Sequence, residues 1–178
     1  MYKRQEDGLT SYELGFHAEY TTKREILEGI SELSKKYHAP IYTHNSESAS
    51  EVVQCVERTG MTPTVYMEQL GLFEYGGGLY HCVHMSEEDL DVVKRHQISV
   101  ITNPASNLKL ASGIAPIEEM LKRNIDLAIG TDGPASNNCL DMFREMFLVT
   151  ALAKYRENDA SAVDAAEVLK LSLIHISE

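Results

Sequence analysis

The chain has 178 residues, of which 43% are hydrophobic and 24% are charged, as is typical of one globular domain. Its formal net charge is −11, and it has no run of lysine or arginine. Both features argue against a nucleic acid or an anionic membrane surface as a partner. The three cysteines lie far apart, which excludes a disulfide framework and a Cys-x-x-Cys zinc site and favours a reducing compartment. Because no apolar run is long enough to span a bilayer and no secretory signal is recognisable, we expect a cytoplasmic protein.

Predicted strands and helices alternate along the chain. Short apolar runs rich in β-branched residues predict strands at residues 11–16, 41–44, 79–84, 98–103 and 124–129. Residues that commonly begin helices follow these strands, namely Thr22, Ser48, Thr62, Ser86, Pro116 and Asn138. A last helix is predicted over residues 161–171, a flexible break at 76–78 and a loop at 104–113. The repeated strand–helix unit predicts a parallel α/β sheet.

Polar side chains lie at or near the carboxyl ends of these strands: His17, His44, His81, Asn103 and Asp132. Doubly wound sheets and (β/α)₈ TIM barrels both place their sites at that edge. All five strands contribute here, whereas a doubly wound sheet concentrates its ligands at one switch point, so a barrel is favoured. A barrel needs eight strands, and we therefore expect residues 11–171 to form part of one, about strands 4 to 8.

Two of these residues have the character of metal ligands. Asp132 stands between two glycines after a buried strand, where a carboxylate is desolvated unless a positive charge lies beside it. His44 ends another apolar strand, and zinc favours imidazole nitrogen and carboxylate oxygen. We predict that His44 and Asp132 bind a metal and that two further ligands come from strands missing here. Glu47, three residues after His44, is then predicted to protonate a leaving group or a ring nitrogen.

The remaining roles follow from the same arrangement. We predict that Asp132 also takes a proton from the attacking water, that His81 orients this water and that His17 binds the substrate. Taken singly, a histidine at a strand end is more often a hydrogen-bonded structural residue, and an aspartate between glycines is a common turn. Their joint occurrence at one edge of a sheet favours the metal site. A barrel that acts only by binding or assembly stays open as an alternative.

Several motifs, taken together and in this order, resemble the amidohydrolase superfamily, and within it the methylthioadenosine/S-adenosylhomocysteine deaminase group, close to the chlorohydrolases. The motifs are Gly15-Phe-His17-Ala, Thr43-His44-Asn-Ser-Glu47, His81-Cys-Val-His84, the run from Asn103 to Pro116, and the run from Gly130 to Asn138. The resemblance covers about residues 14–171.

The resemblance implies one divalent metal ion, usually Zn²⁺ with Fe²⁺ as the alternative, bound by His44 and Asp132. It implies Glu47 as the acid that contacts the base, His81 beside the attacking water and His17 as a substrate contact. The implied reaction is hydrolytic deamination of the adenine ring of 5′-methylthioadenosine or S-adenosylhomocysteine, which gives the inosine analogue and ammonia. Guanine or cytosine deamination, triazine dechlorination and a non-catalytic barrel remain alternatives. A small-molecule partner is implied, and a homo-oligomer is possible for the full-length protein.

The chain also departs from the family pattern. The His-x-His that supplies the family's first two ligands does not occur here, and neither do the substrate contacts of the second and third strands. Residues 1–10 and 172–178 resemble translated adapter sequence, so we expect foreign or disordered ends. We also expect an exposed sheet edge and an inactive chain that binds metal weakly.

Overall fold

The computed structural model describes residues 13–173, so the predicted foreign ends lie almost entirely outside the described residues. Five parallel strands form one sheet in the order β1-β2-β3-β4-β5. The strands are β1 Leu14–Gly15, β2 Ile41–Asn45, β3 Gly77–His81, β4 Ile98–Thr102 and β5 Leu127–Ile129. The sheet order follows the chain order without the reversal that marks a doubly wound sheet. Five sequential βα units of this kind make up part of a (β/α)₈ barrel, which confirms the predicted fold class.

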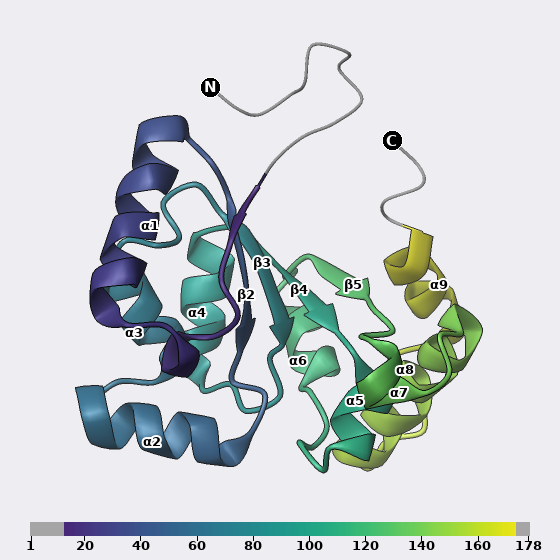
Figure 1. Cartoon of the computed structure of the whole chain (residues 1–178). Coiled ribbons are helices and arrows are strands. Elements are labelled where there is room, and N and C mark those ends of the chain that lie inside the picture. The colour runs from purple at the N-terminus through teal and green to yellow at the C-terminus, as the bar shows by residue number, and fades with distance from the viewer. Residues whose placement is uncertain (1–12, 174–178) are drawn as a thin grey trace.

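Helices connect the strands and lie around the sheet (Figure 1). They are the 3₁₀ turn η1 Glu19–Thr21 and the helices α1 Arg24–Tyr37, α2 Ala49–Thr59, α3 Pro63–Gln69, α4 Glu87–Arg95, α5 Pro104–Lys109, α6 Ile117–Lys122, α7 Pro134–Asn137, α8 Met142–Glu157 and α9 Ala165–Leu173. In Figure 1, α1, α3 and α4 lie together on the left of the sheet, and α5, α7, α8 and α9 gather beyond β5. Within residues 13–173, every helix is too short or too polar to cross a bilayer.

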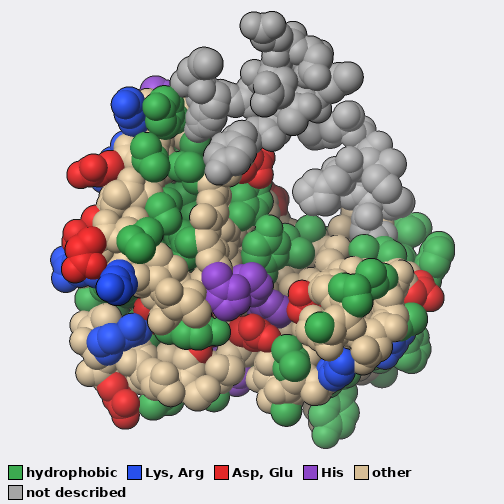
Figure 2. All heavy atoms as spheres, in the orientation of Figure 1, with side chains coloured by type: hydrophobic (Ala, Val, Ile, Leu, Met, Phe, Trp, Pro, Cys, Tyr) green, Lys and Arg blue, Asp and Glu red, His purple; other side chains and the backbone are tan. Residues whose placement is uncertain are grey.

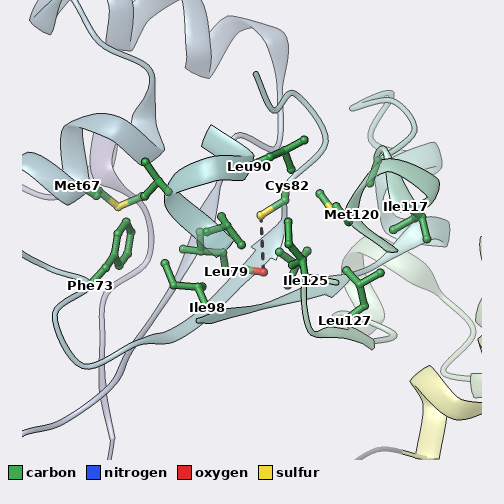
Figure 3. Close-up of a cluster of buried hydrophobic side chains, with 14 of the residues drawn as sticks. Met67, Phe73, Leu79, Cys82, Leu90, Ile98, Ile117, Met120, Ile125 and Leu127 are labelled. Atoms are coloured by element: carbon green, nitrogen blue, oxygen red, sulfur yellow. Dashed lines mark hydrogen bonds between the residues drawn. The ribbon is translucent and has the colours of Figure 1, made fainter. Parts of the chain in front are cut away.

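Side chains alternate across the sheet and separate a packed face from the face that carries the candidate site. In β2, Ile41, Thr43 and Asn45 are buried, while Tyr42 and His44 are half-buried on the opposite face. The buried positions pack against the helices in one hydrophobic core, shown in part in Figure 3. Labelled members of that core include Met67, Phe73, Leu79, Leu90, Ile98, Met120 and Leu127. This packing holds β2 so that His44 points away from the core.

Two predicted helix starts are wrong. Thr22 does not begin α1: it ends η1, where its backbone N–H donates to the carbonyl of Glu19, and Lys23 stands at the N-cap. Asn138 does not begin the long helix α8: it ends the short helix α7 in a left-handed conformation, and Asp141 caps α8 instead. In both places a short turn lies before the long helix and uses the residue that local sequence favours as a cap. The predicted N-caps at Ser48, Thr62 and Ser86 are confirmed.

The glycines at 76–78 are not only a flexible break, because Gly77 and Gly78 belong to strand β3. A Cβ built on Gly77 would lie 1.9 Å from the carbonyl oxygen of Ile41, and the φ of Gly77 is +142°. Only glycine therefore allows β3 to pair with β2 at this register.

Within the described residues, the structure also shortens predicted strands, 11–16 to Leu14–Gly15 and 124–129 to Leu127–Ile129 among them, and adds the short helices α5 and α7. Strand β3 ends at His81 rather than at residue 84, because His81 and Cys82 both have positive φ angles. His84 therefore lies in a loop, where its Nε2 is 2.7 Å from the carbonyl oxygen of Ser112. The predicted loop at 104–113 contains helix α5, which begins with Pro104 after the N-cap Asn103.

Candidate active site

The strand ends of β2, β3, β4 and β5 meet around a pocket of about 300 Å³. Its lining residues are His44, Tyr80, His81, Ile101, Asn103, Gly130 and Asp132. Figure 2 shows histidine side chains gathered in the middle of this face, with acidic side chains next to them. The structure thus brings His44, His81 and Asp132 together, although His44 and Asp132 are 88 positions apart in the sequence.

The imidazole of His44 is held in one tautomer. Its Nδ1 lies 2.7 Å from the carbonyl oxygen of His17. A carbonyl oxygen only accepts hydrogen bonds, so Nδ1 carries a proton, and in the neutral imidazole Nε2 has the free lone pair. Hydrogen bonds of this kind fix the orientation of histidines that bind metals. His44 is therefore prepared to donate Nε2 to a cation.

Three hydrogen bonds hold the carboxylate of Asp132. Its Oδ2 accepts from the hydroxyls of Ser106 (2.6 Å) and Ser136 (2.7 Å), and its Oδ1 accepts from the backbone N–H of Gly133 (2.7 Å). Burial alone would raise the pKa of Asp132, but these hydrogen bonds and the nearby His81 outweigh burial and lower it. Asp132 is therefore ionised at neutral pH. Its Oδ1 accepts only one of these bonds and keeps capacity for a further ligand.

The side chains of His81 and Glu47 lie close to each other at the carboxyl end of β3. His81 is buried, with 1% of its surface exposed, and its Nδ1 is 2.7 Å from the amide oxygen of Asn107. The proton is therefore on Nδ1, and Nε2 lies 3.8 Å from Oε2 of Glu47. The other carboxylate oxygen of Glu47 accepts from the hydroxyl of Ser112 at 3.4 Å. Glu47 thus stands next to the pocket with its carboxylate directed toward His81.

His17 lies at the exposed rim, next to His44. Its ring centroid is 4.6 Å from that of His44, and its Nδ1 is 3.2 Å from the hydroxyl of Thr21. The rings of His44 and His81 stack at 5.3 Å. The three histidines therefore form a continuous row from the rim into the pocket.

The backbone is strained where these side chains leave the strands. Ser46, His81, Cys82 and Asp132 have φ angles of 48°, 70°, 48° and 59°. Residues other than glycine adopt such left-handed angles only where the surrounding structure enforces them. Other non-glycine residues among residues 13–173, such as His38 and Asn158 at helix ends, also have positive φ angles, so this conformation is not confined to the candidate site.

Comparison with known proteins identifies the family. A family model described as "Amidohydrolase family" matches residues 1–175. The chain belongs to the amidohydrolase family. It is 43% identical over 168 residues to a 5-methylthioadenosine/S-adenosylhomocysteine deaminase of Caldanaerobacter subterraneus subsp. tengcongensis, covering 94% of this chain and 39% of that protein. It is 39% identical over 160 residues to a 5′-deoxyadenosine deaminase of Methanocaldococcus jannaschii, covering 89% and 38% of the two chains.

A solved structure agrees with this assignment. The crystal structure of an adenosine deaminase from Xanthomonas campestris with bound zinc superposes with a TM-score of 0.89 and 37% identity, covering 94% of this chain and 38% of that chain. This amidohydrolase chain therefore spans less than two fifths of the length of the relatives that it matches.

The residues present fit a divalent metal as part of its ligand set. His44 offers a nitrogen lone pair and Asp132 an ionised carboxylate, which are donors that zinc prefers. Between residues 13 and 173, however, no group of three or more histidine, cysteine, aspartate or glutamate side chains could hold a metal ion. Two donors are fewer than the three protein ligands of a typical catalytic zinc site. The donor types therefore suit zinc, but the number of ligands in residues 13–173 is too small for a complete site.

Sequence reasoning missed the residues that support the site. Ser106 and Asn107 of α5 bind Asp132 and His81, and they were hidden in a segment predicted to be a loop. The proline that follows Asn103 was the signal for that helix. Glu145 was also missed: its side chain is fully buried and accepts hydrogen bonds from the backbone of Ala105 and from the side chain of Asn137. No local pattern marks such a residue.

Proposed function

We propose that this chain provides five βα units of a metal-dependent hydrolytic deaminase that acts on adenine-containing nucleosides such as 5′-methylthioadenosine or S-adenosylhomocysteine. The observation that carries the proposal is the pocket in which His44 and His81, each fixed in one tautomer, face the ionised Asp132. The names of the relatives at 43% and 39% identity support an adenine nucleoside over guanine, cytosine or a triazine. The full-length enzyme consists of this chain together with the residues that complete the barrel.

In this proposal His44 and Asp132 bind the metal, and residues outside this chain supply the remaining ligands. Zinc is the metal that best suits these donors, with Fe²⁺ as the alternative. Water bound to such a cation becomes acidic enough to lose a proton near neutral pH, and this is the chemistry that the metal supplies when bound.

The side chains of this chain then handle the protons and the substrate. Glu47 donates a proton to N1 of the adenine ring, which makes C6 electrophilic. Asp132 accepts one proton of the attacking water and passes it to the amino group on C6, which leaves as ammonia. The second proton of that water returns to Glu47 as the C6 oxygen becomes the carbonyl of the inosine product. His81 accepts a hydrogen bond at Nε2 and so orients the attacking oxygen, while the exposed His17 contacts the substrate at the rim. A cytoplasmic location and a homo-oligomer stay predictions.

Activity and metal content of the full-length enzyme test this proposal. Ammonia release from 5′-methylthioadenosine should depend on the divalent metal and should fall on the order of 100-fold or more in Asp132→Asn and in Glu47→Gln. Asp132→Asn should also reduce the zinc content, whereas Glu47→Gln should retain it, because only Asp132 is a proposed ligand. Wild-type activity in either variant would overturn the roles given to these two residues. A full-length protein that binds no metal and releases no ammonia would favour the non-catalytic barrel.

A further inference from the structure

Glu51 departs from the capping pattern that its sequence predicts. In a capping box, the glutamate at the third helical position bonds to the backbone N–H of the N-cap, here Ser48. Only half of that box forms. The side chain of Ser48 accepts from the N–H of Glu51 at 3.2 Å, but the carboxylate of Glu51 does not bond to the N–H of Ser48. The carboxylate of Glu51 instead reaches past the N-cap to the strand–helix loop. Its Oε1 accepts from the N–H of Ser46 and its Oε2 from the N–H of Glu47, both at 2.8 Å.

This contact is buried and fixes the peptide from which Glu47 projects. Glu51 has 6% of its surface exposed, and Ser46 is fully buried. The carbonyl of Ser46 accepts hydrogen bonds from the N–H groups of Val83 and His84 at 3.1 and 3.0 Å. Ser46 is thus held from both sides, by α2 through Glu51 and by the loop after β3. Its left-handed φ of 48° is maintained by these four hydrogen bonds.

From this geometry we infer that Glu51 is a positioning residue for Glu47. The inference rests on the proposed function, in which the Glu47 carboxyl group protonates the substrate ring. The Glu51 carboxylate holds two consecutive backbone N–H groups, those of Ser46 and Glu47, and Ser112 and His81 then meet the Glu47 side chain at 3.4 and 3.8 Å. Glu51 itself does not line the pocket. It acts on the reaction only through the place it gives to Glu47.

Glu51→Gln is the sharpest perturbation, because it keeps the size of the side chain. A carboxamide has one acceptor oxygen, so its NH₂ group would face one of the two backbone N–H groups. We expect the Ser46–Glu47 peptide to move, and kcat of the full-length enzyme to fall on the order of 100-fold, the cost typical of a misplacement of about 1 Å. KM and zinc content should stay within twofold of wild type. A kcat within threefold of wild type would overturn the inference.

Asp89→Asn is the matched control. Asp89 is also a fully buried carboxylate in a capping position, where it accepts from the backbone N–H of Ser86 and the hydroxyl of Thr62. None of these three residues lines the pocket. Asp89→Asn therefore reports the general effect of neutralising a buried capping carboxylate, and we expect it to leave kcat within threefold of wild type. An equal loss of kcat in both variants would show that Glu51 has only a general structural role.

Two further measurements separate positioning from general stabilisation. In a Glu47→Gln background, Glu51→Gln should lower the residual kcat no further, because the group that Glu51 positions is already disabled. A further loss equal to that seen in the wild-type background would overturn the inference. Amide hydrogen exchange gives a test that does not need activity. The N–H groups of Ser46 and Glu47 should be protected in wild type and exchange at least tenfold faster in Glu51→Gln.

Exchange also keeps the inference falsifiable if Glu51→Gln fails to fold, since rapid exchange of these two amides in the wild-type chain would overturn it. Failure of the proposed function has a different signature. It would appear as wild-type activity in Glu47→Gln, or as no deamination by the wild-type enzyme, with the exchange result unaffected.

Discussion

Glu145→Gln tests the buried carboxylate that joins three helices behind Asp132. Glu145 is fully buried on α8, where it accepts from the backbone N–H of Ala105 in α5 at 3.0 Å and from the side-chain amide of Asn137 in α7 at 2.8 Å. The same amide of Asn137 donates to the carbonyl of Thr131, next to Asp132. One carboxylate thus stabilises the two short helices that flank the pocket.

The expected magnitude follows from the count of donors. Glutamine has one acceptor oxygen and can satisfy only one of the two N–H groups, while its own NH₂ group faces the other. The lost bond is one to a charged acceptor, which is worth about 1.5–3 kcal/mol. Removing the charge relieves part of the cost of burying it, so we place the net loss in the free energy of unfolding at about 2 kcal/mol. For a chain of this length, that loss corresponds to a decrease in Tm of about 4–8 °C.

Urea unfolding of the 178-residue chain, followed by circular dichroism, measures this loss. The control is Glu57→Gln, which removes the same charge from an exposed position on α2 and should change the free energy of unfolding by less than about 0.5 kcal/mol. A Glu145→Gln variant as stable as wild type, or more stable, would refute the reasoning. It would mean that relief from burying a charge outweighs the lost hydrogen bond.

Three more predictions use the same chain. Burial raises the pKa of Cys82 to about 12. In the native state at pH 8, an alkylating reagent should therefore modify the exposed Cys139 and leave Cys82 unmodified until the chain unfolds. Mass spectrometry of the labelled chain checks this prediction. Burial would raise the pKa of Glu68, but hydrogen bonds from an arginine and a histidine at the end of α4 lower it overall. A lowered pKa stabilises the fold above the unfolded-state value and loses this effect as pH falls. Glu68→Gln should therefore be less stable than wild type at pH 7, and the difference should shrink below about pH 4; equal differences at pH 7 and pH 3 would contradict it. Gly77→Ala should lower the free energy of unfolding by more than about 3 kcal/mol or prevent folding, because its Cβ would meet a carbonyl of β2 at a positive φ. The control Gly29→Ala in α1, with no atom within 4 Å of the new Cβ, should be neutral or stabilising in the same unfolding assay.

Local patterns in the sequence were sufficient for the order of the elements and for the residues at the strand ends. The alternation of Ile41, Thr43 and Asn45 with polar or aromatic neighbours, and the caps at Ser48 and Ser86, depend on contacts within four residues. Signals of that range can be read without a fold. They were enough to predict a parallel sheet and to place His44 and Asp132 at one edge of it, which the structure confirms.

Tertiary structure decided how those residues are held. His81 depends on Asn107, 26 residues away, and Ala105 depends on Glu145, 40 residues away. Glu51 stands where a capping-box glutamate would bond to its own N-cap, yet its carboxylate binds the loop before the helix. Such pairs form only when packing brings distant segments within about 3 Å, and a single side-chain rotamer then selects the partner. The sequence alone therefore determined which residues reach the edge of the sheet, and only the packed fold determined their tautomers, charge and orientation.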